Sequence, residues 1–338
     1  MNLKKKRIVI CVFTFIVLPL LILGCNENNN EVDSNNMAEV IHLDKGAVLK
    51  NEDGEYNIYN YENHKYSKVE NQSVILSYDK KNSSYICIED GKHFIVYNNN
   101  KYIIKDEKYE GLKLSPNGNY ISYFVDDNGL KLKVFKNSDN SEINLKSEVL
   151  ISGTLYDWYD ENTLVYYGIK NDKTNGLFTY NLLTNKEELI YVVKEGYLAY
   201  LKGTVDNLLF LQLNLENDKE LVLVNKETKN SNVLSSEIEE LNDIIMLDED
   251  IYFTGKMKDD LRSLYEIKDN KIKRLIFDFP ALIKTEKGLI SDSEGNILIV
   301  GNDDISSQYE KIYSYNKDKS VSVVSDGSVD YLFIDYRE

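Results

Sequence analysis

The sequence predicts an all-β fold, and more specifically a β-propeller built from four-stranded blades. From residue 38 onward no stretch shows the 3.6-residue periodicity of an amphipathic helix. Runs of β-branched and aromatic residues instead alternate with short clusters of Asn, Asp, Gly and Lys, which is the pattern of strands and turns. These runs recur at a spacing of about 43 residues. A unit of that size cannot bury both of its faces alone, so the units are expected to stack into a ring.

One strand of each repeat is recognisable because it ends in an aromatic or β-branched residue followed by Asn or Lys. The residues at these strand ends are Tyr59, Tyr97, Phe135, Tyr180, Val224, Ile267 and Tyr315. A second strand precedes most of them after a polar turn, and its copies begin at Tyr120, Leu164, Leu208, Ile251 and Ile297. Seven copies predict seven blades. A ring of six or eight blades and a pair of all-β domains are the alternatives.

Two further strand-like runs flank the repeats. Val40–Leu43 precedes the first copy, and Val329–Asp335 follows the last one. A propeller with an open ring would leave a sheet edge without a partner. We therefore expect strands from both ends of the repeat region to close the ring.

One copy of the repeat carries a sharper motif. The run from Leu114 to Tyr123, LSPNGNYISY, resembles the S-P-D-G signature of TolB-like propeller repeats, which are WD-like in their four-stranded unit. Pro116 suits the second position of a turn, and Gly118 tolerates a positive φ. A partial copy follows at Asp157-Trp158, and Asn117 stands where the family has Asp. The resemblance implies the propeller fold and implies no activity.

The first 25 residues have the form of an export signal. Lys4, Lys5, Lys6 and Arg7 precede the apolar run from residue 8 to residue 23. The run ends in Ile-Leu-Gly-Cys25, which resembles the lipobox of bacterial lipoproteins, although Leu23 is bulkier than the usual residue. The resemblance implies a signal peptide over residues 1–24 and lipidation of Cys25. An uncleaved signal anchor is the alternative.

The lipobox also predicts how the rest of the chain is organised. Residues 25–37 are rich in Asn and poor in apolar residues, which predicts a flexible tether. The propeller domain is then expected over residues 38–338. These predictions place the protein on the extracytoplasmic face of a cell membrane, anchored through Cys25. Richness in Lys, Asn, Ile and Tyr is typical of an AT-rich genome and indicates a Gram-positive source.

Charge and cysteine content exclude several classes of function. The chain has 40 Lys and Arg against 56 Asp and Glu, a formal charge of -16, which excludes nucleic acid as a partner. Removal of residues 1–24 takes away four basic residues and no acidic ones, so the mature charge is 36 minus 56, or -20. Cys11 lies in the signal and Cys25 accepts the lipid, which leaves Cys87 without a disulfide partner in the mature chain. Cys87 lies in a strand-like run and is expected to be a buried small apolar residue.

Motifs for catalysis or metal binding are weak. The sequence has no G-x-S-x-G, and Ser293 is expected to be a turn residue rather than a nucleophile. His42, His64 and His93 lack the spacing of a zinc site. Acidic loops could hold calcium, but Asx-Gly turns explain them equally well. No cofactor and no metal are therefore expected.

The sequence therefore predicts a monomeric, non-catalytic propeller that binds or scaffolds an envelope protein or glycan. The expected binding surface consists of loops between second and third strands and loops between blades. Its candidate residues are Asp126, Asp127, Asp172, Lys173, Asp218, Lys219, Asp259, Asp260, Asp303 and Asp304. One alternative is an envelope glycan hydrolase or lyase that uses carboxylates in the central channel. The other is a structural spacer without a ligand.

Overall fold

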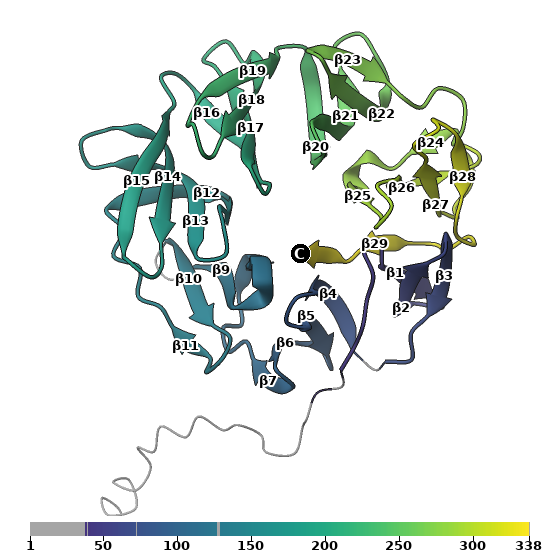
Figure 1. Ribbon diagram of the computed structural model, residues 1–338, viewed down its shortest axis with the longest axis horizontal. Coiled ribbons are helices and arrows are strands. Elements are labelled where there is room, and N and C mark those ends of the chain that lie inside the picture. The colour runs from purple at the N-terminus through teal and green to yellow at the C-terminus, as the bar shows by residue number, and fades with distance from the viewer. Residues whose placement is uncertain (1–37, 39, 72, 127–128, 338) are drawn as a thin grey trace, which may run out of the picture. The chain divides into compact units, whose positions relative to one another are not determined.

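Seven small sheets are arranged around a central axis as a seven-bladed β-propeller (Figure 1). The computed structural model describes residues 38, 40–71, 73–126 and 129–337. The predicted signal peptide, Cys25, the tether and Asp127 lie outside the described residues. Helical turns in the described part are the short 3-10 turns η1 (Pro116–Gly118) and η2 (Thr285–Lys287). None of its helices is long and apolar enough to cross a membrane.

The first four blades follow the chain in order, and their strands are given from the innermost outward. Blade 1 contains β29 (Tyr331–Phe333), β1 (Val48–Glu52), β2 (Glu55–Glu62) and β3 (Lys65–Lys68). Blade 2 contains β30 (Asp335–Arg337), β4 (Val74–Asp79), β5 (Ser84–Glu89), β6 (Lys92–Tyr97) and β7 (Asn100–Ile103). Blade 3 contains β8 (Tyr109–Leu114), β9 (Tyr120–Asp126), β10 (Leu130–Lys136) and β11 (Ser141–Glu142). Blade 4 contains β12 (Val149–Trp158), β13 (Thr163–Lys170), β14 (Asn175–Asn181) and β15 (Lys186–Val192).

The last three blades complete the ring. Blade 5 contains β16 (Tyr197–Gly203), β17 (Asn207–Leu213), β18 (Lys219–Asn225) and β19 (Ser231–Ser235). Blade 6 contains β20 (Ile238–Leu247), β21 (Asp250–Met257), β22 (Arg262–Lys268) and β23 (Lys271–Arg274). Blade 7 contains β24 (Leu282–Ile283), β25 (Leu289–Ser291), β26 (Ile297–Asn302), β27 (Lys311–Tyr315) and β28 (Val321–Val323). All seven strand ends that mark the sequence repeat lie on the third strand of a blade, if the added strand β30 of blade 2 is not counted, so the predicted blade count is confirmed.

The C-terminal residues close the ring. β29 pairs antiparallel with β1, with Phe333 opposite Val48, and supplies the innermost strand of blade 1. β30 then pairs parallel with β4, with Arg337 opposite Asp79, and adds an inner strand to blade 2. The C-terminal end lies at the centre of the ring in Figure 1. The predicted C-terminal strand is therefore present, but it is divided between two blades.

The prediction of an N-terminal closing strand is wrong. Val40–Leu43 forms no strand, because β29 already occupies the inner edge of β1. Ile41 and Leu43 are instead buried in an apolar cluster with residues of blades 1 and 2. Their apolar character serves packing rather than sheet pairing.

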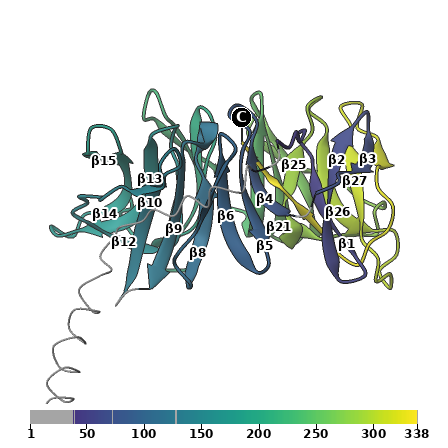
Figure 2. The ribbon, with the colours of Figure 1, turned by 90° about the horizontal axis from the view of Figure 1, so that it is seen from below.

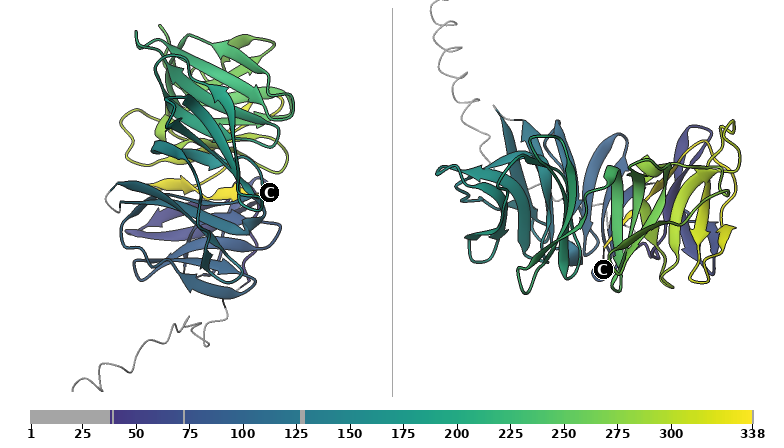
Figure 3. Two further views of the ribbon diagram at one scale, coloured as in Figure 1. Left: turned by 90° about the vertical axis from the view of Figure 1, so that its left-hand side faces the viewer. Right: turned by 90° about the horizontal axis from the view of Figure 1, so that it is seen from above.

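Alternating strand directions give the ring two faces, which Figures 2 and 3 show edge-on. Face A carries the connections between second and third strands and those between blades, including residues 171–174, 258–261 and 276–281. Face B carries the turns between first and second strands and between third and fourth strands, including residues 115–119 and 204–206. Arg337 ends at face B, because β30 runs parallel to β4.

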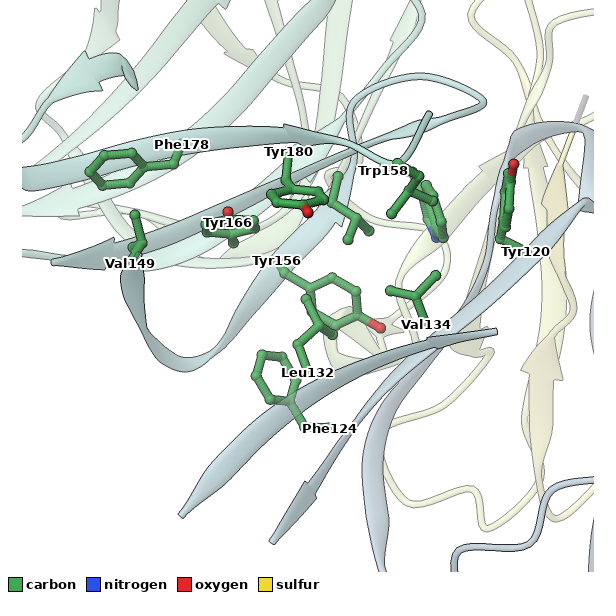
Figure 4. Close-up of a cluster of buried hydrophobic side chains, with 12 residues drawn as sticks. Tyr120, Phe124, Leu132, Val134, Val149, Tyr156, Trp158, Tyr166, Phe178 and Tyr180 are labelled. Atoms are coloured by element: carbon green, nitrogen blue, oxygen red, sulfur yellow. The ribbon is translucent and has the colours of Figure 1, made fainter. Parts of the chain in front are cut away.

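Aromatic side chains fill the space between neighbouring blades. Figure 4 shows the cluster between blades 3 and 4, to which Tyr120, Phe124, Leu132, Val134, Val149, Tyr156, Trp158, Tyr166, Phe178 and Tyr180 contribute. Trp158 stacks on Tyr120 with ring centroids 6.0 Å apart, and Phe124 meets Tyr156 edge-on at 5.2 Å. Each such pair adds about 0.5–1.5 kcal/mol beyond the area it buries. Blade packing therefore explains the abundance of tyrosine.

The S-P-N-G turn has a steric reason for its glycine. Asn117 and Gly118 adopt φ values of 66° and 62° within η1. A Cβ atom on Gly118 would lie 2.7 Å from the Cβ of Ser84 in the neighbouring blade. The turn thus requires a residue without a side chain, as the motif predicts.

Cys87 is expected to resist alkylation in the folded protein. Its side chain is fully buried on β5, and burial raises the pKa of the thiol to about 12. Iodoacetamide at pH 8 should label Cys87 only after unfolding, as read by peptide mass spectrometry. Labelling of Cys87 at the same rate with and without denaturant would contradict this burial.

Candidate functional site

A pocket with a volume of about 640 Å³ lies in the central channel. Its walls are the ends of the inner strands of blades 5, 6 and 7 together with the C-terminal segment. The turn at 204–206 belongs to this lining, so the pocket lies toward face B. The predicted binding loops lie on the opposite face.

Ion pairs join the inner strands of successive blades along the channel. Lys113 Nζ on β8 lies 3.1 Å from Asp157 Oδ1 on β12. The other carboxylate oxygen of Asp157 accepts a hydrogen bond from Gly203 N on β16, at 2.8 Å. Lys202 Nζ on β16 lies 2.6 Å from Asp243 Oδ1 on β20, and Leu289 N donates to Asp243 Oδ2 at 3.3 Å. These contacts link the inner strands of blades 3 to 7.

The channel carboxylate of Asp157 is held in its ionised form. Its side chain is almost fully buried, and burial alone would raise its pKa. Lys113, Arg337 and the Gly203 N–H oppose burial and hold the pKa of Asp157 below its ordinary value. An ionised, paired carboxylate is a poor proton donor at neutral pH.

Carboxyl groups with a raised pKa occur elsewhere. Burial raises the pKa of Asp79 and that of Glu310. Asp79 lies at the end of β4, which pairs with β5, and its side chain contacts the turn of blade 3. Glu310 accepts a hydrogen bond from Tyr331 N at 3.2 Å. Neither residue lines the channel pocket. Of the acids that line the pocket, Asp243 pairs with Lys202 and Asp335 pairs with Arg337.

The predicted binding loops all lie on face A, as the strand count indicates. Asp126 ends β9, and the other described candidates lie in or beside the second turns of blades 4 to 7. Most of them bond within their own blades, Lys219 Nζ donates a hydrogen bond to Glu239 O in blade 6, and none of them lines the channel pocket. Asp303 pairs with Lys311, and Asp260 pairs with Arg274.

The sequence did not predict that face A exposes many large apolar side chains. Of the exposed large apolar side chains that the structure describes, most lie at this face: Leu130, Leu150, Ile169, Val192, Tyr197, Leu215, Leu261, Phe277, Phe279, Leu282, Ile305, Tyr309 and Val329. They belong to blades 3 to 7 and to the connection that returns to blade 1. On face B, Leu183 and Val205 are exposed large apolar residues in turns. A large apolar residue inside an otherwise polar turn, such as Leu261, is the signal that could have revealed this asymmetry.

A groove on face A lies between blade 6 and its connection to blade 7, with a volume of about 390 Å³. Leu261, Phe277 and Leu282 form its apolar walls. Arg274 lines it as well and stacks its guanidinium 4.6 Å from the ring centroid of Phe277. We call this feature the blade 6–7 groove.

The histidines and acidic residues of the described part form no group that could hold a metal ion. His64 lies 3.4 Å from Glu294 at face B, and His93 packs edge-on against Tyr109. The acidic turns bond to their own backbone, as Asp304 does to Ser306 N at 2.8 Å. This hydrogen bonding is that of Asx turns.

Solved structures similar to this chain share the propeller fold at low sequence identity. The β-propeller domain of the trilobed protease from Pyrococcus furiosus matches with a TM-score of 0.55 and 11% identity, over 85% of this chain and 98% of that one. An oligogalacturonate lyase in complex with manganese matches with a TM-score of 0.52 and 13% identity, over 86% of each chain. A prolyl endopeptidase matches with a TM-score of 0.55 and 11% identity, over 75% of this chain and 43% of the peptidase. This chain thus spans less than half of the peptidase.

TolB from Acinetobacter baumannii also matches, with a TM-score of 0.46 and 12% identity, over 70% of this chain and 64% of TolB. No protein-family model matches the chain, and no curated protein does. Likeness at these identities shows the fold alone. The chain is therefore a seven-bladed β-propeller, the fold that its repeats predict.

Proposed function

We propose that the chain is a lipid-anchored, extracytoplasmic propeller that binds an envelope protein through face A without turning it over. Lipidated Cys25 would hold it at the membrane, and the tether of residues 25–37 would let the propeller reach its partner. The strongly acidic composition keeps the propeller itself away from anionic headgroups.

The observation that carries this proposal is the gathering of exposed apolar side chains on face A. Large exposed apolar groups that cluster on one surface mark protein interfaces. Leu215, Leu261 and Ile305 are 78%, 67% and 77% exposed at the tips of turns in three consecutive blades. Phe277 and Tyr309 add exposed aromatic rings, the residue type that anchors protein interfaces.

The ion pairs of the channel favour binding over catalysis. Glycoside hydrolysis needs two carboxyl groups, one of which must donate a proton. Asp157 and Asp243 are instead paired with lysines, and the buried acids of raised pKa lie outside the pocket. A glycan hydrolase or lyase remains the alternative function, and turnover of a purified envelope glycan by the protein would establish it.

Variants of face A and of face B should differ in the amount of partner that they capture. The double variant Leu261→Asp/Ile305→Asp places two charges on face A, and Leu183→Asp/Val205→Asp places two on face B at sites of similar or greater exposure. Each protein is immobilised and incubated with solubilised envelope proteins, and the captured species are quantified by mass spectrometry. We expect one species to be captured by the native chain and the face B variant and to fall at least about tenfold with the face A variant. Equal capture by all three proteins would contradict the proposal.

A further inference from the structure

A small apolar pocket lies between blades 3 and 4 near face A, with a volume of about 170 Å³. Its floor includes Leu132 and Val149, which are buried. Its walls include Ile143, Leu145 and Ile151, which pack against the apolar cluster between the two blades. The pocket is smaller than typical small-molecule sites of about 300–1,000 Å³, so it suits a single side chain. We call it the blade 3–4 pocket.

Exposed leucines and few charges surround the mouth of this pocket. Leu130 and Leu150 line it and are 43% and 76% exposed. The polar residues of its lining are Lys131, Glu142, Asn144 and Ser147. Outside the lining the nearby charges also balance, because Asp126 and Lys146 are exposed and Glu148 pairs with Lys170. The pocket therefore has no net charge and favours an uncharged, apolar group.

The strand edge beside the pocket is partly uncovered. β11 pairs with only the last two residues of β10, whereas β15 in blade 4 pairs with β14 along most of its length. The chain that follows β11 bonds to blade 4 instead. Lys146 N donates to the Tyr180 hydroxyl at 3.0 Å, and Ser147 Oγ donates to Glu187 Oε1 at 2.6 Å. The first half of β10 therefore has no strand along its outer edge.

Leu130 has backbone groups that point toward this open edge. Ile143 N donates to Val134 O at 2.8 Å, so the backbone groups of Val134 face outward. Alternate residues of a strand face the same edge, so those of Leu132 and Leu130 face outward as well. Leu132 is almost fully buried, but Leu130 is exposed and has no hydrogen bond on this side to any described residue. Leu130 can therefore offer a donor and an acceptor to an added strand.

We propose that the blade 3–4 pocket and the edge at Leu130 together bind an extended segment of a partner protein, with one apolar side chain in the pocket. In an antiparallel pair, the segment residue opposite Leu130 exchanges both backbone hydrogen bonds with it. Opposed residues point to the same face of a sheet, and Leu132, which shares the face of Leu130, packs in one cluster with Val149 of blade 4. The side chain of that segment residue therefore enters the pocket. This inference rests on the proposed function, because it names how a partner on face A contacts blades 3 and 4.

An extended peptide matches these features better than a glycan or a helix does. A sugar would bring hydroxyl groups into an apolar pocket, where they would lose their hydrogen bonds to water. A helix bonds its backbone groups internally and would leave the edge at Leu130 unpaired. An extended chain supplies both a backbone for the edge and a side chain for the pocket.

Fluorescence anisotropy with three short labelled peptides tests the two halves of this site. The first peptide has one leucine among threonines, the second has serine in place of the leucine, and the third keeps the leucine but carries a methyl group on its amide nitrogen. We expect the full-length protein to bind the leucine peptide at least about tenfold more tightly than the serine peptide, because the pocket buries the side chain. N-methylation should weaken binding about fivefold, because it removes one bond to the strand edge.

Matched variants of the protein locate the binding site. Leu130→Ser should weaken binding of the leucine peptide several-fold, because it removes an apolar wall of the pocket. Leu215→Ser makes the same replacement on an exposed turn of blade 5 and should leave binding unchanged. Thermal unfolding of Leu130→Ser should stay close to that of the native protein, because Leu130 is 43% exposed.

Several results would overturn this assignment. They are equal binding of the leucine and serine peptides, no loss on N-methylation, equal effects of Leu130→Ser and Leu215→Ser, and no measurable binding at about 1 mM peptide. Self-association of the native chain that Leu130→Ser abolishes would assign the edge to a second copy and would also overturn it. Leu261→Asp/Ile305→Asp leaves the pocket intact, so capture that falls with that variant keeps the proposed function standing whatever the peptides do. Capture that does not change with that variant overturns the function itself.

Discussion

Deletion of residues 331–338 is expected to lower the midpoint of thermal unfolding by about 10 °C or more. The deletion removes β29, the innermost strand of blade 1, and leaves the inner edge of β1 unpaired. It also removes Tyr331 and Ile334, which are 2% and 1% exposed. Each buried side chain of this size contributes about 1.5–3 kcal/mol, a large share of the 5–15 kcal/mol that stabilises a typical domain. Calorimetry or circular dichroism during heating measures the effect.

Deletion of residues 335–338 alone is the matched control for closure. This shorter deletion removes β30 and Arg337 but keeps β29 on β1 and the Ile334 N–H bonded to Ala47 O at 3.1 Å. We expect a clearly smaller decrease in the unfolding midpoint than for the longer deletion. Equal decreases would show that β30, and not β29, provides the closure.

The repeated part of the fold could be predicted because each blade carries the same local signals. The strand β14, whose last residues are Tyr180 and Asn181 and which leads into a polar turn, shows the pattern that recurs in every blade. Gly118 could be assigned to a turn because it follows Pro116 and Asn117 in the motif and glycine tolerates a positive φ, which is 62° in the structure. Such signals lie within a few residues of one another and need no knowledge of distant pairing.

The ends of the ring could not be predicted in the same way. Val40–Leu43 and Tyr331–Phe333 both have strand-like composition, and only one of them could occupy the inner edge of β1. The outcome depends on pairing between Val48 and Phe333, which lie far apart in the chain. The local sequence of either segment does not show which of the two pairs with β1.

The position of the candidate site could be predicted from the sequence, but the chemical character of its side chains could not. Counting strands located the turns of face A, such as the one that contains Asp259 and Asp260. The blade 6–7 groove was missed because Leu261 and Phe277 have no periodic pattern to reveal them. The channel pair of Lys113 and Asp157 was missed because its members are 44 positions apart among many charged residues.

Replacement of Asp157 by alanine is expected to reduce the free energy of unfolding by about 3–5 kcal/mol at pH 7. The substitution leaves Lys113 and Arg337 without the buried negative charge that they face. It also removes the acceptor of the Gly203 N–H, which joins blade 4 to blade 5. Asp172→Ala, at an exposed turn of the same blade, is the control and should change the free energy by less than about 0.5 kcal/mol. Denaturant titration measures both variants.

The contribution of Asp157 should also depend on pH in a defined direction. Its pKa is lower in the folded chain than in the unfolded chain, where an aspartate titrates near about 3.9. The ionised form therefore stabilises the folded state above that pH, and the contribution is lost as the pH falls through the folded pKa. The stability difference between the native chain and Asp157→Asn should be largest at neutral pH and should shrink below about pH 4. In addition, Lys113→Met combined with Asp157→Asn should cost less than the sum of the single substitutions. Additive costs, or a difference that does not vary with pH, would show that the 3.1 Å contact between Lys113 and Asp157 does not stabilise the ring.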